Sequence, residues 1–122
     1  MKRDLEVIQK ILQKSISTSE ELSDLDSEGV DRQSVYYHIQ LIESAGLAVC
    51  SVKYGGDTGQ TIPSSAVLFR LVNKGHDLAE ALSNESVWKK VQSKFIIPSA
   101  QWTLSNVATF AFKALAKELG LE

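Results

Sequence analysis

Few side chains in this sequence could act as nucleophiles, general bases or metal ligands. The chain has one cysteine, Cys50, and two histidines, His38 and His76. Neither histidine has a cysteine, histidine or carboxylate partner at the spacing of a metal site, so we expect no metal ion. Cys50 lies in an apolar run, where a thiol packs as a small hydrophobe. His38 lies beside an apolar helical stripe and is predicted to be a partly buried core residue with one hydrogen bond.

One short motif spells a catalytic signature but lacks the context that the chemistry needs. Asp57-Thr58-Gly59 is the triplet of retroviral-type aspartic proteases. In such a site an apolar strand before each aspartate holds two carboxylates close enough to share one proton. Here Gly55 and Gly56 precede Asp57, and no Gly-Lys-Ser/Thr follows to form a phosphate-binding loop. The motif therefore predicts a turn, and we expect a protein that is not an enzyme and has no cofactor.

Polar and aromatic side chains recur on one side of residues 31–45. At about 100° per residue of a helix, Val35, Ile39 and Ile42 point together toward the core. The opposite side carries amide, phenol and hydroxyl groups, with one arginine at its flank: Arg32, Gln33, Tyr36, Tyr37, Gln40 and Ser44. Glutamine can pair with adenine and arginine with guanine, and tyrosine can donate to a phosphate. These residues are candidates for reading the major groove of DNA; the alternative is a solvated face with partly buried tyrosines.

The elements that would hold this face follow from hydrophobic spacing and turn residues. Apolar spacing and capping residues predict helices over residues 4–14, 31–45, 74–82, 85–95 and 105–119, with Asn73 as the cap of the third. Two runs rich in β-branched and aromatic residues, 47–54 and 66–72, flank a glycine-rich turn. They predict an antiparallel hairpin.

The segment over residues 15–30 is less regular. After Ile16 its strong apolar residues are Leu22 and Leu25. Its type stays open between a short helix over 19–25 and a short strand over 21–25. We favour a short, irregular piece.

The order of these elements is that of a winged helix. A helix that ends in Ala45-Gly46-Leu47 can turn sharply at the glycine and pass directly into a strand. The sequence therefore predicts an α+β, mostly helical protein with a winged helix-turn-helix core over residues 1–75 and a two-stranded wing. A C-terminal helical extension over residues 76–122 is expected to pack on this core, so that the chain forms one structural domain.

The tip of the hairpin, residues 53–61, is the candidate wing. Lys53, the backbone at Gly56, and Gln60 could contact the DNA backbone, although the carboxylate of Asp57 works against this. The alternative is a plain flexible hairpin loop.

Several segments resemble known families. Residues 35–47 resemble the recognition helix of winged helix-turn-helix regulators. Three segments in order resemble the domain of unknown function 2513 family of small bacterial and prophage proteins: Met1-Lys2-Arg3-Asp4; Tyr37-His38-Ile39 with Ala45-Gly46-Leu47; and Lys74-Gly75-His76-Asp77 with Val87-Trp88-Lys89-Lys90. This resemblance implies the fold and a prophage-type setting but no activity. The chain departs from the winged-helix pattern at residues 19–25, where the short helix that braces the recognition helix is weak or absent.

The last predicted helix is apolar around most of its girth. One face consists of Val107, Phe110, Ala111, Ala114 and Leu115. Such a helix is either buried centrally or shared with another subunit. We favour the second alternative, a homodimer contact through these five residues.

Charge limits the class of partner. The sequence has 13 Lys and Arg against 15 Asp and Glu, a formal net charge of −2, and residues 15–31 hold six carboxylates and no Lys or Arg. This balance argues against strong binding to nucleic acid of any sequence, which needs many phosphate contacts. It permits sequence-specific binding through one face, to which Lys2 and Arg3 could add phosphate contacts.

We therefore expect a sequence-specific protein that binds double-stranded DNA, of the kind that regulates prophage transcription. The sequence has no apolar run of membrane-spanning length, and its first four residues are not followed by the apolar region of a signal peptide. It predicts a cytoplasmic protein. The alternative is a protein–protein interaction module on the same scaffold, with a host or phage regulatory protein as its partner. The acidic stretch and the apolar last helix motivate that alternative.

Overall fold

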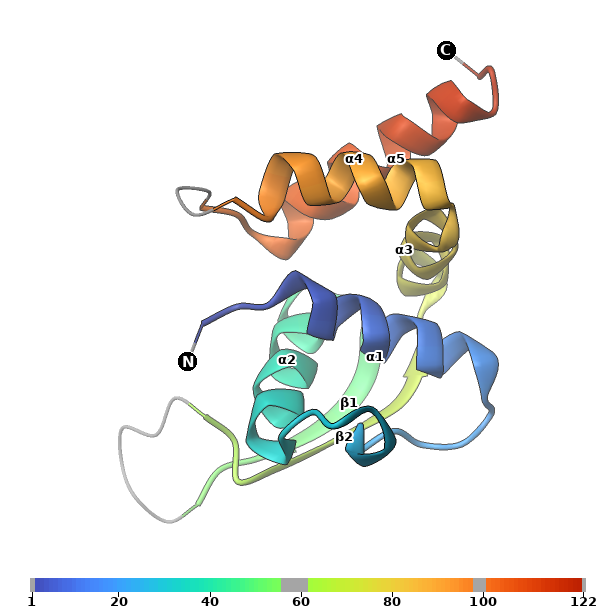
Figure 1. The fold of residues 1–122 in the computed structure, drawn as a ribbon. Coiled ribbons are helices and arrows are strands. Elements are labelled where there is room, and N and C mark those ends of the chain that lie inside the picture. The colour runs from blue at the N-terminus through green and yellow to red at the C-terminus, as the bar shows by residue number, and fades with distance from the viewer. Residues whose placement is uncertain (1, 56–61, 98–100, 122) are drawn as a thin grey trace.

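The computed structural model describes residues 2–55, 62–97 and 101–121. These residues form an α+β, mostly helical fold, as expected, with five α-helices, one 3₁₀ turn and a two-stranded antiparallel sheet (Figure 1). The elements in order are α1 (Leu5–Ser17), η1 (Asp26–Glu28), α2 (Arg32–Ser44), β1 (Ala48–Lys53), β2 (Ser65–Leu71), α3 (Asn73–Ser83), α4 (Glu85–Phe95) and α5 (Leu104–Glu118). The predicted helices and the predicted hairpin are confirmed, and the proposed boundary at residue 75 falls inside α3.

Local chemistry explains where α1 and α2 begin and where α2 ends. The carboxylate of Asp4 accepts from the amide of Glu6, and that of Asp31 accepts from the amide of Ser34. Each satisfies a donor that the first turn leaves free. Gly46 takes a φ of +73°, which favours glycine, and the buried Leu47 follows it directly. The predicted turn from α2 into β1 is therefore confirmed.

The segment before α2 is short and irregular, as favoured. Leu22 exchanges backbone hydrogen bonds of 2.9 and 2.8 Å with Leu68 of β2, so it forms an isolated bridge at the edge of that strand. Leu25 bridges Val30 and so encloses η1. Neither a helix over residues 19–25 nor a strand over 21–25 forms, because the backbone groups of Leu22 and Leu25 bond to different partners. Both leucine side chains are buried.

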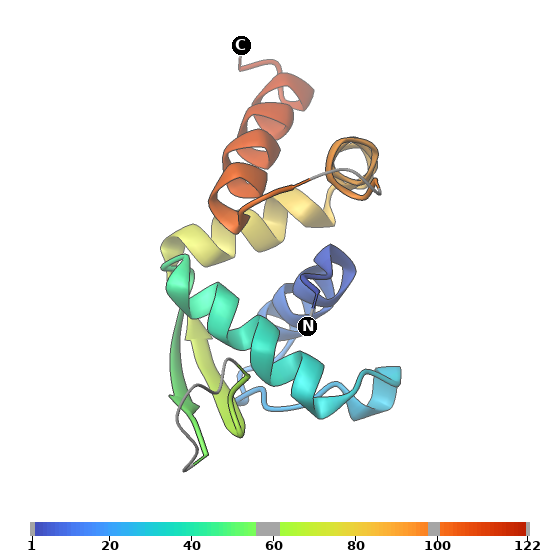
Figure 2. The same cartoon turned by 90° about the vertical axis from the view of Figure 1, so that its left-hand side faces the viewer.

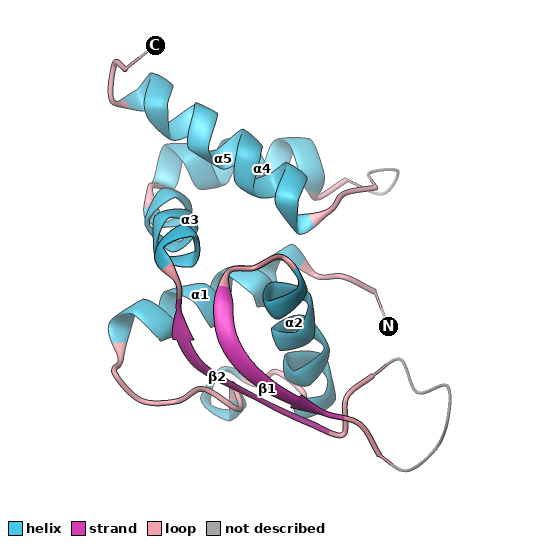
Figure 3. Cartoon of the chain, turned by 180° about the vertical axis from the view of Figure 1, so that it is seen from behind, coloured by secondary structure: helices cyan, strands magenta, loops and turns pink. Residues whose placement is uncertain are grey.

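Helices α1 and α2 cover one face of the hairpin. The antiparallel register pairs Cys50 with Leu68, with an irregularity between Val49 and Cys50. Both helices pack against this sheet and against each other. Figure 3 shows the opposite face of the hairpin, across which no described helix runs. Val49 of β1 and Phe69 of β2 are exposed.

Helices α4 and α5 lie at the opposite end of the molecule from the strands β1 and β2 (Figures 1 and 2). Helix α3 packs against α1 on one side and against α4 and α5 on the other, so it joins the two halves. The predicted cap at Asn73 is wrong. The amide of Val72 bonds to the carbonyl of Leu47, which extends the strand pairing up to the start of α3, and Asn73 becomes the first helical residue.

In the described part of the chain, no helix is both long enough and apolar enough to span a bilayer.

Candidate functional site

The polar side of α2 faces outward, as its spacing predicted. Val35, Ile39 and Ile42 have no exposed surface. Burying each of these side chains stabilises the fold by about 1.5–3 kcal/mol. The opposite side, here named the α2 surface, consists of exposed Gln33 and Ser44 and half-buried Tyr36, Tyr37 and Gln40. The structure thus brings these five predicted site residues onto one side of one helix.

His38 is fully buried and makes two hydrogen bonds to backbone, so the expectation of a partly buried residue with one bond is wrong. Its Nε2 accepts from the amide of Asp4 at 2.8 Å, and its Nδ1 lies 2.6 Å from the carbonyl of Ser34. An amide can only donate and a carbonyl can only accept, so the ring is neutral with its proton on Nδ1. Burial lowers the pKa of His38 and favours this neutral form.

This histidine ties the N-terminal segment to α2. The ring of Tyr37 meets the His38 ring edge-on, with centroids 5.2 Å apart. Tyr37, a residue of the α2 surface, therefore contacts the histidine whose Nε2 accepts from the Asp4 amide. Sequence reasoning missed the pair because Asp4 and His38 are 34 positions apart, and no local pattern links them.

Arg32, predicted to read guanine, is already paired. Its Nη2 lies 2.6 Å from Asp26 Oδ2, and its Nε also donates to that carboxylate. The hydrogen bonds from Arg32 lower the pKa of Asp26. The η1 turn carries Asp26 back against the first turn of α2, close to Asp24, Glu28 and Asp31 in the chain. A guanine or phosphate would therefore have to compete with Asp26 for Arg32.

Both strands of the hairpin are described, and residues 56–61 between them are not. Lys53 is exposed at the end of β1, where its carbonyl accepts from the amide and the hydroxyl of Ser64. The other two predicted wing contacts, Gly56 and Gln60, lie outside the described residues.

Three of the five residues of the predicted dimer face are buried within the chain. Val107 and Ala111 have no exposed surface and Ala114 has 6%. Helices α3 and α4 of the same chain pack against α5, and Phe110 meets Phe95 of α4 edge-on at 5.5 Å. The prediction is therefore wrong for the buried residues of this face. Phe110 and Leu115, the other two predicted contacts, are half-buried.

The remaining candidate reactive groups are the Cys50 thiol and the His76 ring. Burial, with a smaller effect of Glu43, raises the pKa of the Cys50 thiol to about 12. His76 is exposed on α3. Within residues 2–55, 62–97 and 101–121, no group of three or more His, Cys, Asp or Glu side chains could hold a metal ion.

Comparison with known proteins yields one family and one relative. A family model described as "Hypothetical protein (DUF2513)" matches residues 2–100. The chain is also similar to an uncharacterised protein of Haemophilus influenzae, with 28% identity over 123 residues that cover 98% of this chain and 99% of the relative. No solved structure matches.

Proposed function

The chain belongs to the DUF2513 family, and we propose that it is a winged-helix protein that binds double-stranded DNA to regulate transcription and catalyses no reaction. The order of elements carries the proposal. It runs from α1 through the Leu22 bridge, η1 and α2 into the hairpin of β1 and β2. In this arrangement η1 would take the place of the first helix of a helix-turn-helix, and α2 the place of its second, recognition helix.

The α2 surface suits a role in reading bases. Gln33, Tyr37 and Gln40 are spaced four and three residues apart, which aligns them along one side of the helix. The amide of a glutamine can donate and accept at once and so pair with adenine in the major groove. The branched aliphatic residues on the other side are fully buried. Helix α2 could therefore enter a groove while these residues stay packed in the core.

Basic residues on either side of α2 could contact the DNA backbone. Figure 2 views the molecule from the side on which the N-terminal segment, α2 and the end of β1 all lie. Lys53 is exposed at the turn end of β1, and Lys2 and Arg3 are exposed in the N-terminal segment. Contacts to phosphates from these positions would orient α2 in the groove without carrying sequence information.

The test is selection of a preferred site from random double-stranded DNA, followed by binding measurements over a range of salt concentrations. Gln33→Ala combined with Gln40→Ala should lower the preference for the selected site by about 1–3 kcal/mol for each lost pair and leave the fold intact. Gln92→Ala, a matched change on α4, should have no effect. Unchanged preference in the double variant would show that α2 does not read the bases.

One observation favours a second function, protein–protein interaction on the same scaffold. Arg32, the basic residue at the start of α2, is bound to Asp26, and further carboxylates precede it in the chain. Such an end would repel phosphates and suit a basic protein surface, such as that of a host or phage regulator. Absence of any DNA complex at low salt would favour this function over the first.

A further inference from the structure

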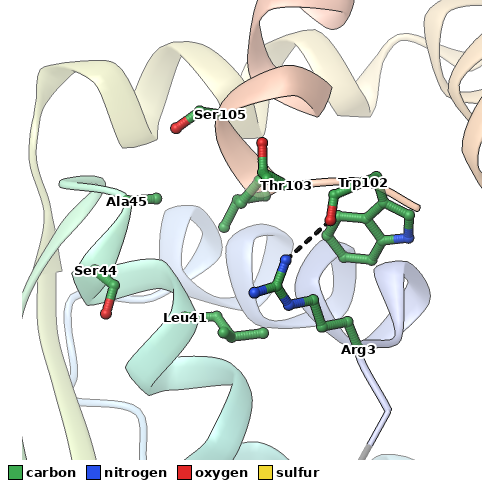
Figure 4. Close-up of a pocket in the computed structure, with 8 residues that line it drawn as sticks. Arg3, Leu41, Ser44, Ala45, Trp102, Thr103 and Ser105 are labelled. Carbon is green, nitrogen blue, oxygen red and sulfur yellow. Dashed lines mark hydrogen bonds between the residues drawn. The ribbon is translucent and has the colours of Figure 1, made fainter.

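A cavity of about 170 Å³ lies between the N-terminal segment, the C-terminal end of α2 and the start of α5 (Figure 4). Its apolar lining includes Leu41, Ala45 and Trp102, and its polar lining includes Arg3, Ser44 and Ser105. The cavity therefore joins three segments that are far apart in the sequence.

The guanidinium of Arg3 occupies the middle of this lining, between Leu41 and Thr103 in Figure 4. Its Nη1 donates to the carbonyl of Trp102 at 2.9 Å. No carboxylate of the described residues lies within ion-pair distance of Arg3, in contrast to Arg32. A guanidinium has five N–H donors, so most of those on Arg3 remain for a ligand.

The volume of the cavity and the chemistry of its lining indicate which kind of ligand it could bind. A cavity of about 150 Å³ is known to hold benzene, so this one has room for a molecule with a body of that size. Leu41, Ala45 and the Trp102 ring would contact such a body. The hydroxyls of Ser44 and Ser105 make no hydrogen bond to any other described residue, so both can donate to a negatively charged group.

We propose that this cavity binds a small carboxylate with a compact apolar or aromatic body, and that Arg3 holds the carboxylate. Two parallel N–H bonds from a guanidinium match the two oxygens of a carboxylate. No described acid in the lining opposes the charge, and the apolar part of the lining disfavours a bare inorganic anion. The bound molecule would connect the N-terminal segment, α2 and α5.

The test uses the two tryptophans as probes. Trp102 lines the cavity, whereas Trp88 is on α4 and does not. The indole N–H signals of the two residues are followed by NMR while sodium benzoate is added, with assignment by Trp88→Phe. Sodium chloride at the same ionic strength and uncharged benzyl alcohol serve as controls. We expect a saturable shift of the Trp102 signal with benzoate alone, no shift of Trp88, and a higher melting temperature.

Two variants test separately the contribution of the Arg3 charge and that of the free volume of the cavity. Arg3→Ala should weaken benzoate binding about ten- to a hundredfold, because it removes charge-assisted hydrogen bonds. Ala45→Leu should abolish binding by filling the cavity while Arg3 remains. Lys2→Ala, which removes a neighbouring cation that does not line this cavity, should bind as the wild type does.

Three results would overturn the proposal: no saturable shift of Trp102, an equal response to benzyl alcohol, or unchanged binding in Arg3→Ala. None of these measurements involves DNA. A failure here therefore leaves the proposed DNA binding standing, and a failure to bind DNA leaves this site standing.

Discussion

The two ends of α2 differ in charge and in how they are held. At the N-terminal end, Arg32 is paired with Asp26, and Asp31 caps the helix. At the C-terminal end, Arg3 donates to a backbone carbonyl and has no carboxylate partner among the described residues. A phosphate or a carboxylate ligand should therefore be disfavoured at the first end and favoured at the second.

The two ends of α2 also differ in how closely they pack against the rest of the molecule. Residues 26–29, which precede the helix, are all exposed, and η1 has no buried residue. The C-terminal end turns at Gly46 into Leu47, which is buried, and Gly75 of α3 packs directly against the Leu47 carbonyl. We infer that the C-terminal end is fixed by close backbone contacts. The N-terminal end is held by the Asp31 cap, by one exposed ion pair and by buried Leu25, which bridges Val30.

The largest effect should come from Gly75→Ala. A Cβ at residue 75 would lie 2.0 Å from the Leu47 carbonyl oxygen and 3.0 Å from the Leu47 carbonyl carbon. Backbone cannot move aside as a side chain can, so the clash should outweigh the gain of about 1 kcal/mol in helix propensity. We expect the free energy of unfolding to fall by about 3 kcal/mol or more, measured by urea denaturation.

The matched change at the other end is Gly29→Ala. Gly29 has a φ of +73° but nothing within 4 Å of the new Cβ. Only the conformational cost applies, about 1–2 kcal/mol. Equal losses for the two variants would contradict the difference in packing between the two ends.

The next effect concerns His38, which holds the N-terminal segment against α2. Its pKa is lowered from 6.5 by burial, so the folded ring stays neutral at a pH where the unfolded chain takes up a proton. The unfolded state then binds more protons below pH 6.5. The free energy of unfolding should therefore fall with decreasing pH in that range, by at most about 1.4 kcal/mol per pH unit. Above that pH the contribution of His38 should be constant.

His38→Gln tests this assignment by urea denaturation on both sides of that pH. The variant should lose about 2 kcal/mol at neutral pH, because glutamine does not replace both the acceptor for the Asp4 amide and the donor to the Ser34 carbonyl. It should also lose the pH dependence assigned to His38. His76→Gln, at an exposed position of α3, should keep it. If the free energy of unfolding of His38→Gln still falls with decreasing pH, the pH dependence belongs to another titrating group.

Sequence reasoning reached the features of α2 that depend on near neighbours. Asp31, the apolar stripe and Gly46 lie within or beside one helix, and helical geometry relates them directly. The bond from Arg3 to Trp102 spans 99 positions, and nothing local signals it. The predicted dimer contact through Val107, Ala111 and Ala114 of α5 was wrong for a related reason. Its apolar width predicted burial, but whether a second subunit or α3 and α4 cover Val107 depends on how the chain folds back.

The smallest effect should come from Asp26→Asn. The ion pair with Arg32 is exposed, at 60% and 51% of the two side chains, so its loss should leave stability almost unchanged. The change removes one negative charge and frees Arg32 at the end of the α2 surface. If α2 enters DNA, affinity measured by fluorescence anisotropy should rise at low salt, and the gain should fade as salt increases.

Glu85→Gln is the charge-matched control, because it breaks the exposed pair with Lys89 on α4, away from α2. An equal rise in both variants would mean that only net charge matters. A fall in Asp26→Asn alone would mean that Asp26 positions Arg32 for its contact with DNA. In that case the acidic turn belongs to the binding surface, and the contrast in charge between the two ends of α2 would not predict where a phosphate is held.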